Sequence, residues 1–313
     1  MSGPPLRTTT NGCTRIRRLK PAQTSSPNEQ RAALAARRAG LGFALPAVGW
    51  ILLFFAAPLA VMAIYSLLPL TANGSPAHLS LGAYRSFFAE PAYVQAIWNS
   101  VVTTAIVVIV SLLLAYPFAW ILAFRIPKRW QRLALACAIL PFWTSYVVRS
   151  YAWLLVLAPT GVINSVLINL HLIERPITLA YNPNATILGF VHFFIMLNAL
   201  TIYANLVQIN PRYVLAAQDL GASAWRSFFA VTFPLSVPGM AVGAFLTVVL
   251  CIGDFITPQI LGGNKELLLP QVIMLQIQRQ LDLPMASVMS LVLTAIVAVV
   301  YLLLQRPMRM ARL

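Results

Sequence analysis

Three ionisable side chains, Arg149, His192 and Asp254, interrupt otherwise apolar stretches of this 313-residue chain. Ionisable residues inside long apolar segments are costly, so each of them is a candidate for function. The carboxylate of Asp254 would attract a cationic amine, whereas the guanidinium of Arg149 would attract an anion. The third residue, His192, is more typical of a histidine that forms a hydrogen bond between packed helices.

Aromatic residues lie close to the arginine in the sequence, at Trp143, Tyr151 and Trp153. The faces of aromatic rings bind cations, so these three residues together with Asp254 and Arg149 predict a pathway for a small charged solute. An alternative is that Arg149 and Asp254 pair with each other. In that case the aromatic residues would form the belt that marks a membrane–water interface.

Six long apolar segments must position these side chains. They cover approximately residues 41–69, 95–124, 132–158, 184–208, 236–261 and 285–305. Each is long enough to cross a bilayer, which takes about 20 residues of helix. Along straight helices, Arg149 would lie roughly 26 Å into the third span and Asp254 roughly 27 Å into the fifth. Both would then lie near the same, external face of the membrane.

Composition supports this fold class. Hydrophobic residues make up 59% of the chain and charged residues 9%, whereas about a quarter of a soluble protein is charged. The sequence therefore predicts an all-α protein with six transmembrane helices, embedded in a lipid bilayer. Shorter helices are expected near Tyr84–Phe88, within Val162–Leu172 and along the amphipathic piece Leu268–Leu281.

The charged ends of the chain indicate its domain organisation. Residues 1–40 are rich in Arg, Pro, Ser and Thr without apolar periodicity, which predicts a disordered basic tail. Residues 41–306 form the transmembrane domain, and residues 307–313 form a short C-terminal tail.

Basic residues also predict the orientation. Of the 22 Lys and Arg residues, 17 fall in the two tails and in the loops after the second and fourth spans. Of the seven acids, only Glu29 and Asp219 lie on that side. The positive-inside rule places both termini and the loop 211–234 in the cytoplasm. The basic charge is thus explained by topology, and no motif for binding nucleic acid accompanies it.

The residue types do not indicate a metal site, a disulfide, a membrane enzyme or a secondary transporter. The three cysteines, Cys13, Cys137 and Cys251, match no metal or disulfide spacing. The three histidines and seven acids are too dispersed for a metal site or a membrane enzyme. A secondary transporter would need repeats and a central carboxylate, and no clear repeat is present. No cofactor or metal is expected.

The loop between the fourth and fifth spans holds two helix-forming runs, Leu215–Leu220 and Ala222–Phe229, separated by Gly221. Glycine commonly ends a helix because it adopts the left-handed conformation. Pro234 would close the second run. The pattern predicts two short helices joined at Gly221, outside the membrane.

This loop resembles the coupling loop of the permeases of type I ABC importers. The matching residues are Ala216, Ala217, Gly221, Ala222, Phe228, Pro234 and Pro238, and Leu215 stands where the family has Glu. Further segments resemble the permeases of polyamine importers: Asn99-Ser100, Tyr116-Pro117, Leu140–Ser145, Val148–Trp153, Gly161–Asn164, Gly253–Phe255 and Leu261–Gly263.

The resemblance implies a type I ABC importer permease in the bacterial inner membrane. Its partners would be a second permease, two ATP-binding subunits and a periplasmic solute-binding protein. The chain has no GxxxxGK[ST] loop, so ATP would be bound by a partner. The ATPase would contact Leu215, Ala216, Ala217, Gln218, Asp219, Gly221 and Arg226. The solute would be a polyamine such as putrescine or spermidine, or alternatively an anion that binds Arg149.

Overall fold

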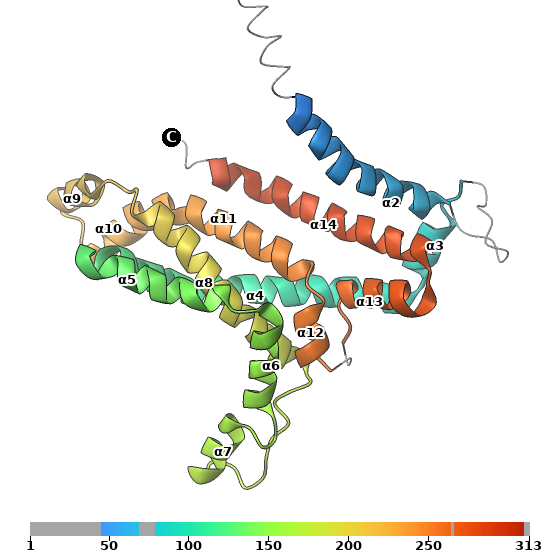
Figure 1. Cartoon of the computed structure of the whole chain (residues 1–313). Coiled ribbons are helices and arrows are strands. Elements are labelled where there is room, and N and C mark those ends of the chain that lie inside the picture. The colour runs from blue at the N-terminus through green and yellow to red at the C-terminus, as the bar shows by residue number, and fades with distance from the viewer. Residues whose placement is uncertain (1–44, 69–78, 264–265, 310–313) are drawn as a thin grey trace, which may run out of the picture. The chain divides into compact units, whose positions relative to one another are not determined.

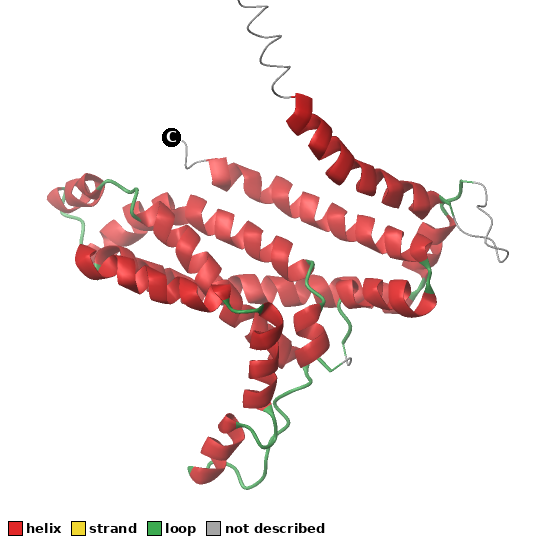
Figure 2. Cartoon of the chain, viewed as in Figure 1, coloured by secondary structure: helices red, strands yellow, loops and turns green. Residues whose placement is uncertain are grey.

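A computed structural model describes residues 45–68, 79–263 and 266–309. The expected basic tail 1–40 and the last four residues, 310–313, lie outside the described residues. The chain divides into two units, residues 1–59 and 60–313. Throughout the described ranges the secondary structure consists of helices joined by loops, without strands (Figure 2).

Within the described residues, six helical stretches are long and apolar enough to cross a membrane. They are Leu45–Leu67, Pro91–Phe124, Tyr146–Asn169, Pro183–Leu206, Ala224–Ile252 and Leu283–Met308. This result confirms the predicted all-α class and the number of spans. The bounds of the third and fifth stretches differ from those expected.

The first unit contributes residues 45–59 to the described chain. Residues 45–51 are helical, the π-helical segment η1 covers Leu52–Ala56, and α2 (Ala57–Leu67) begins directly after it.

In the second unit, three long helices form the core. The helix α4 (Pro91–Phe124) packs against α8 (Pro183–Leu206) and α11 (Phe233–Ile252), and α11 also packs against α14 (Leu283–Arg309), as Figure 1 shows. The start of α8 follows from its sequence, since Pro183 suits a first helical turn and the side chain of Asn182 accepts a hydrogen bond from the Ala185 amide at 2.9 Å.

A buried amide joins these three helices. The side chain of Asn198, on α8, is fully buried and donates hydrogen bonds to Ser111 on α4 (3.1 Å) and Thr247 on α11 (2.9 Å). Such polar contacts between membrane helices typically contribute about 0.6–2 kcal/mol each. Asn198 therefore fixes the register of α4, α8 and α11 relative to one another.

Small residues allow α8 and α11 to approach closely beside Asn198. A Cβ atom at Gly243 would lie too close to Asn198 Oδ1 and Thr201 Oγ1, and one at Gly239 would lie 2.6 Å from the Asn205 Cβ. Gly239 and Gly243 lie four positions apart on α11, which is the spacing of small residues by which membrane helices commonly associate.

Replacing Gly243 with Ala should therefore destabilise the fold. The new methyl group would have to displace the Asn198 side chain, whose amide nitrogen donates to Ser111 and Thr247, at a cost of about 1–3 kcal/mol. Thermal unfolding of the purified protein should show a lower midpoint. The matched control is Gly49→Ala, because a Cβ there meets nothing within 4 Å. Equal midpoints for the two variants would contradict the predicted close contact.

The predicted shorter helices are present in the second unit. They are α3 (Gly82–Ala89), α7 (Val162–Asn169) and α13 (Leu269–Leu275), the last continuing into the π segment η4 (Gln276–Gln280). Their buried residues Phe87 and Leu269 pack in one cluster with Val288 and Met289 of α14.

The prediction of one straight third span, 132–158, is wrong. Residues Lys128–Ile139 form α5, a 3-10 segment η2 covers Leu140–Trp143, and a new helix, α6 (Tyr146–Leu157), begins after a break at 144–145. Figure 1 shows that α6 turns sharply away from the direction of α5. Pro141 lacks a backbone N–H, which disfavours a regular helix at this point. The estimated depth of Arg149 therefore does not hold.

The fifth span also differs from its expected bounds, 236–261. Its helix begins earlier, at Ala224, and α11 ends at Ile252. A turn at Gly253-Asp254 separates it from α12 (Ile256–Leu261). Two helix breaks, one before Tyr146 and one at Asp254, thus interrupt the apolar spans.

Candidate functional site

The loop 211–234 forms a bent connection, which we call the elbow. Its first helix, α9 (Pro211–Asp219), begins with an Asn210 cap whose side chain accepts a hydrogen bond from the Arg212 amide at 3.0 Å. Its end is set by Gly221, which adopts a φ of +84°. The amide of Ala222 donates to the Ala217 carbonyl (3.0 Å), and that of Gly221 donates to the Gln218 carbonyl (2.8 Å). This is the hydrogen-bond pattern of a glycine-ended helix, as the sequence predicted.

The second half of the elbow differs from the prediction. A short helix α10 (Ala224–Ser227) begins at a Ser223 cap and continues through the π segment η3 (Phe228–Thr232) into α11. The expectation that Pro234 closes a separate helix is wrong, because the chain is helical without a break from Ala224 to Ile252 and Pro234 lies within that stretch. A displacement of α10 would therefore be transmitted directly to α11.

The elbow exposes most of the predicted ATPase-contacting residues. Leu215 is 56% exposed, Ala217 is half-buried, and the other five are exposed: Ala216, Gln218, Asp219, Gly221 and Arg226. The neighbouring Leu220 is 90% exposed. Tyr213 and Trp225, which were not among the predicted residues, are 57% and 74% exposed.

The two helix breaks meet at a second cluster of functional candidates. The hydroxyl of Tyr146, the first residue of α6, donates a hydrogen bond to the carboxylate of Asp254. Asp254 also accepts hydrogen bonds from the backbone amides of Ile256 (2.8 Å) and Thr257 (3.3 Å) at the start of α12. The carboxylate thereby ties α6 to α12, and sequence reasoning missed Tyr146.

Arg149 belongs to the same cluster through aromatic rings. Its guanidinium carbon lies 5.0 Å from the centre of the Tyr146 ring and 4.5 Å from that of Phe193 on α8. Cation–π contacts of this kind contribute about 0.5–2 kcal/mol. The structure thus brings Arg149 and Asp254 to one tyrosine, whose ring contacts the guanidinium while its hydroxyl binds the carboxylate.

The predicted aromatic residues have three different environments. Trp153 donates its indole N–H to Nδ1 of His192 at 3.0 Å, which confirms His192 as a hydrogen-bonded histidine between helices. Trp143, in η2, is 82% exposed. Tyr151 lines a cavity. The sequence therefore grouped three side chains that the structure separates.

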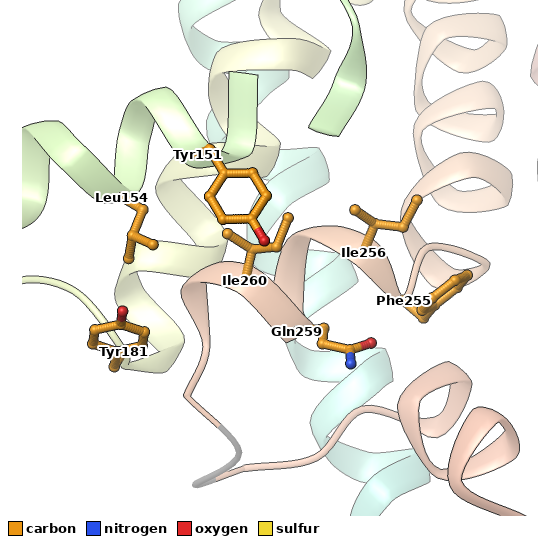
Figure 3. A pocket seen from close by; sticks show the side chains of 7 residues that line it. All are labelled: Tyr151, Leu154, Tyr181, Phe255, Ile256, Gln259 and Ile260. Atoms are coloured by element: carbon orange, nitrogen blue, oxygen red, sulfur yellow. The ribbon is translucent and has the colours of Figure 1, made fainter. Parts of the chain in front are cut away.

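The cavity lies between α6 and α12 and has a volume of about 350 Å³. Figure 3 shows Tyr151 and Leu154 reaching it from α6, and Phe255, Ile256, Gln259 and Ile260 from the α12 segment. Tyr181 completes the lining. The rings of Tyr151, Tyr181 and Phe255 and the amide of Gln259 line this cavity, and Phe255 directly follows Asp254 in the chain. Such a lining suits an organic cation, with an apolar chain between amino groups.

Metal chemistry gains no support from these side chains. Across the described ranges, no group of three or more His, Cys, Asp or Glu residues is arranged to hold a metal ion.

Comparison with known proteins gives a consistent family assignment. Residues 115–310 match the family of binding-protein-dependent transport system inner membrane components. The spermidine/putrescine transport system permease protein of Haemophilus influenzae is 32% identical, over 80% of this chain and 87% of its own length. The protein of the same description from Escherichia coli is 30% identical, over 84% of this chain and 95% of its own length.

Solved structures show the same fold. A chain of a bacterial alginate ABC transporter, solved in complex with an alginate pentasaccharide-bound periplasmic protein, matches with a TM-score of 0.69 and 16% identity, over 86% of this chain and 93% of its own length. A chain of a bacterial ABC transporter involved in import of the acidic polysaccharide alginate also matches with a TM-score of 0.69, at 18% identity, over 90% of this chain and 98% of its own length.

Proposed function

Since this chain belongs to the family of inner-membrane components of binding-protein-dependent transport systems, and is thus a multi-pass permease of an ABC importer, we propose that its solute is a polyamine. Two relatives described as spermidine/putrescine permeases match most of the chain, which supports this solute. The observation that carries the proposal is an aromatic-lined cavity whose lining residues Phe255 and Ile256 directly follow Asp254 in the chain.

The proposed partners are a second permease, two ATP-binding subunits and a periplasmic solute-binding protein. ATP hydrolysis would occur in the ATP-binding subunits. We further propose that both termini and the elbow lie in the cytoplasm, because the basic residues concentrate on that side.

The elbow is the proposed contact for an ATP-binding subunit. Leu215 and Leu220 offer exposed apolar side chains, and Ala216 permits close approach of a partner surface. Because Asp219 and Arg226 are charged and exposed, they would set the register at the rim of the contact. The continuous helix from α10 into α11 would transmit a displacement towards Asp254 at the far end of α11.

The proposed pathway follows the second cluster. Asp254 would attract the ammonium groups, while Tyr151 would present an aromatic face in the cavity. Arg149, fixed against two rings, would repel a cation that moves past Asp254 and so direct it along the pathway. Trp143 and Trp153 remain predicted pathway residues, with Trp153 engaged by His192.

Reconstitution of the whole transporter tests this function. ATP hydrolysis should rise when the solute-binding protein is added with putrescine or spermidine, and it should not rise with an organic anion of similar size. Stimulation by the anion alone would instead support a pathway in which Arg149 binds the solute.

A further inference from the structure

A second cavity lies where α4 ends and α10 begins, far in sequence from the proposed pathway. Its volume is about 440 Å³, within the usual range for small-molecule sites. It is lined by Tyr116, Pro117, Trp120, Arg125, Ala224, Trp225 and Phe228. Three lining residues, Ala224, Trp225 and Phe228, belong to the elbow, but none of the seven is among the residues predicted to contact the ATPase.

Tyr116 connects the two walls of the cavity. Its ring packs edge-on against Phe228, with ring centres 5.9 Å apart, and its hydroxyl lies 3.0 Å from the Ser236 hydroxyl on α11. These contacts hold α4 against the η3–α11 segment, so the packing of these helices fixes the walls of the cavity.

The lining combines one cation with an apolar wall. Arg125 is its only charged member, and its guanidinium carbon lies 5.5 Å from the centre of the Trp120 ring. The other lining residues are aromatic or aliphatic. Further basic residues follow at Lys128, Arg129 and Arg132. A ligand that fits this pattern carries one anionic group and an apolar chain.

The position of the cavity identifies the source of such a ligand. Arg125 directly follows Phe124, the last residue of one apolar span, and Ala224 is the first residue of another. The cavity therefore lies at the ends of two apolar spans, and it holds two tryptophans, a residue that is enriched at membrane–water interfaces.

We propose that this cavity binds one anionic phospholipid, with its phosphate at Arg125 and an acyl chain against Trp120 and Trp225. Anionic lipids attract basic residues near the membrane surface. A lipid in this position would join the end of α4 to α10, the helix through which the elbow continues into α11. The inference goes beyond the proposed transport function and does not depend on the solute.

Lipid binding to the delipidated, purified transporter complex tests the proposal. Phosphatidylglycerol and phosphatidylcholine would be added in turn, and the copies retained would be counted by native mass spectrometry. We expect one tightly retained phosphatidylglycerol and no such phosphatidylcholine. Arg125→Gln should weaken its retention about fivefold, the effect of about one basic residue near the surface.

Two further variants separate a specific site from general attraction. Arg132→Gln makes the same change of charge outside the cavity lining, so phosphatidylglycerol retention should change less than twofold. Ala224→Leu fills the cavity without changing the charge and should also release the lipid. Equal losses for Arg125→Gln and Arg132→Gln, or equal retention of both lipids, would overturn the proposal, as would a partner chain found to occupy the cavity.

Discussion

Replacing Asp254 with Asn is expected to abolish polyamine uptake while the transporter still assembles and keeps its basal ATP hydrolysis. The substitution removes the negative charge that directly precedes the cavity-lining residue Phe255, but leaves a side chain of similar size and one carbonyl acceptor. Hydrogen bonds to charged groups contribute about 1.5–3 kcal/mol, so the loss of charge alone should reduce uptake at least tenfold. Uptake of labelled spermidine into proteoliposomes measures this effect.

The matched control for this prediction is Tyr146→Phe. It removes the hydroxyl that donates to Asp254 and keeps both the carboxylate and the ring against Arg149. If Asp254 acts by attracting the cation, Tyr146→Phe should retain most of the uptake. If its role is only to tie α6 to α12, both variants should lose uptake equally. Normal uptake by Asp254→Asn would remove this residue from the pathway.

Replacing Gly221 with Val should uncouple ATP hydrolysis from stimulation by the solute-binding protein. Gly221 has a φ of +84°, a conformation that a β-branched residue adopts only at a cost of about 1–2 kcal/mol or more. Because α9 must then end differently, the exposed Leu215 and Leu220 would no longer be presented in the same orientation. ATP hydrolysis by the reconstituted complex, measured with and without the loaded binding protein, reports the coupling.

The variant Gly221→Asn distinguishes two effects of adding a side chain at this position: strain in the left-handed backbone, and collision of the side chain with a partner surface. A Cβ at this position meets nothing within 4 Å, so no substitution is excluded by collision. Asn tolerates the left-handed conformation far better than Val does, so it should retain most of the stimulation. Loss of coupling in both variants would indicate that the partner surface approaches Gly221 itself, and full stimulation of Gly221→Val would refute the role of the turn.

Much of the architecture could be read from the sequence because local physics determines it. The lengths of the apolar segments predicted six membrane-spanning helices, since an unpaired backbone is not tolerated in hydrocarbon. The end of α9 was likewise predictable, because glycine readily adopts the left-handed conformation that ends a helix, and this depends on the local sequence alone. The cap of α8 at Asn182 follows the same kind of local chemistry.

Contacts between distant residues were decided by the tertiary structure alone. Tyr146 and Asp254 are 108 positions apart, and Trp153 and His192 are 39 apart, so neither hydrogen bond follows from spacing along the chain. The breaks before α6 and after α11 let α12 pack against α6 and α8, and hydropathy does not encode these contacts. The sequence thus supplied the spans, the elbow and the charged candidates. Packing determined which of them share a site, because side chains in a helical bundle meet according to helix register and direction.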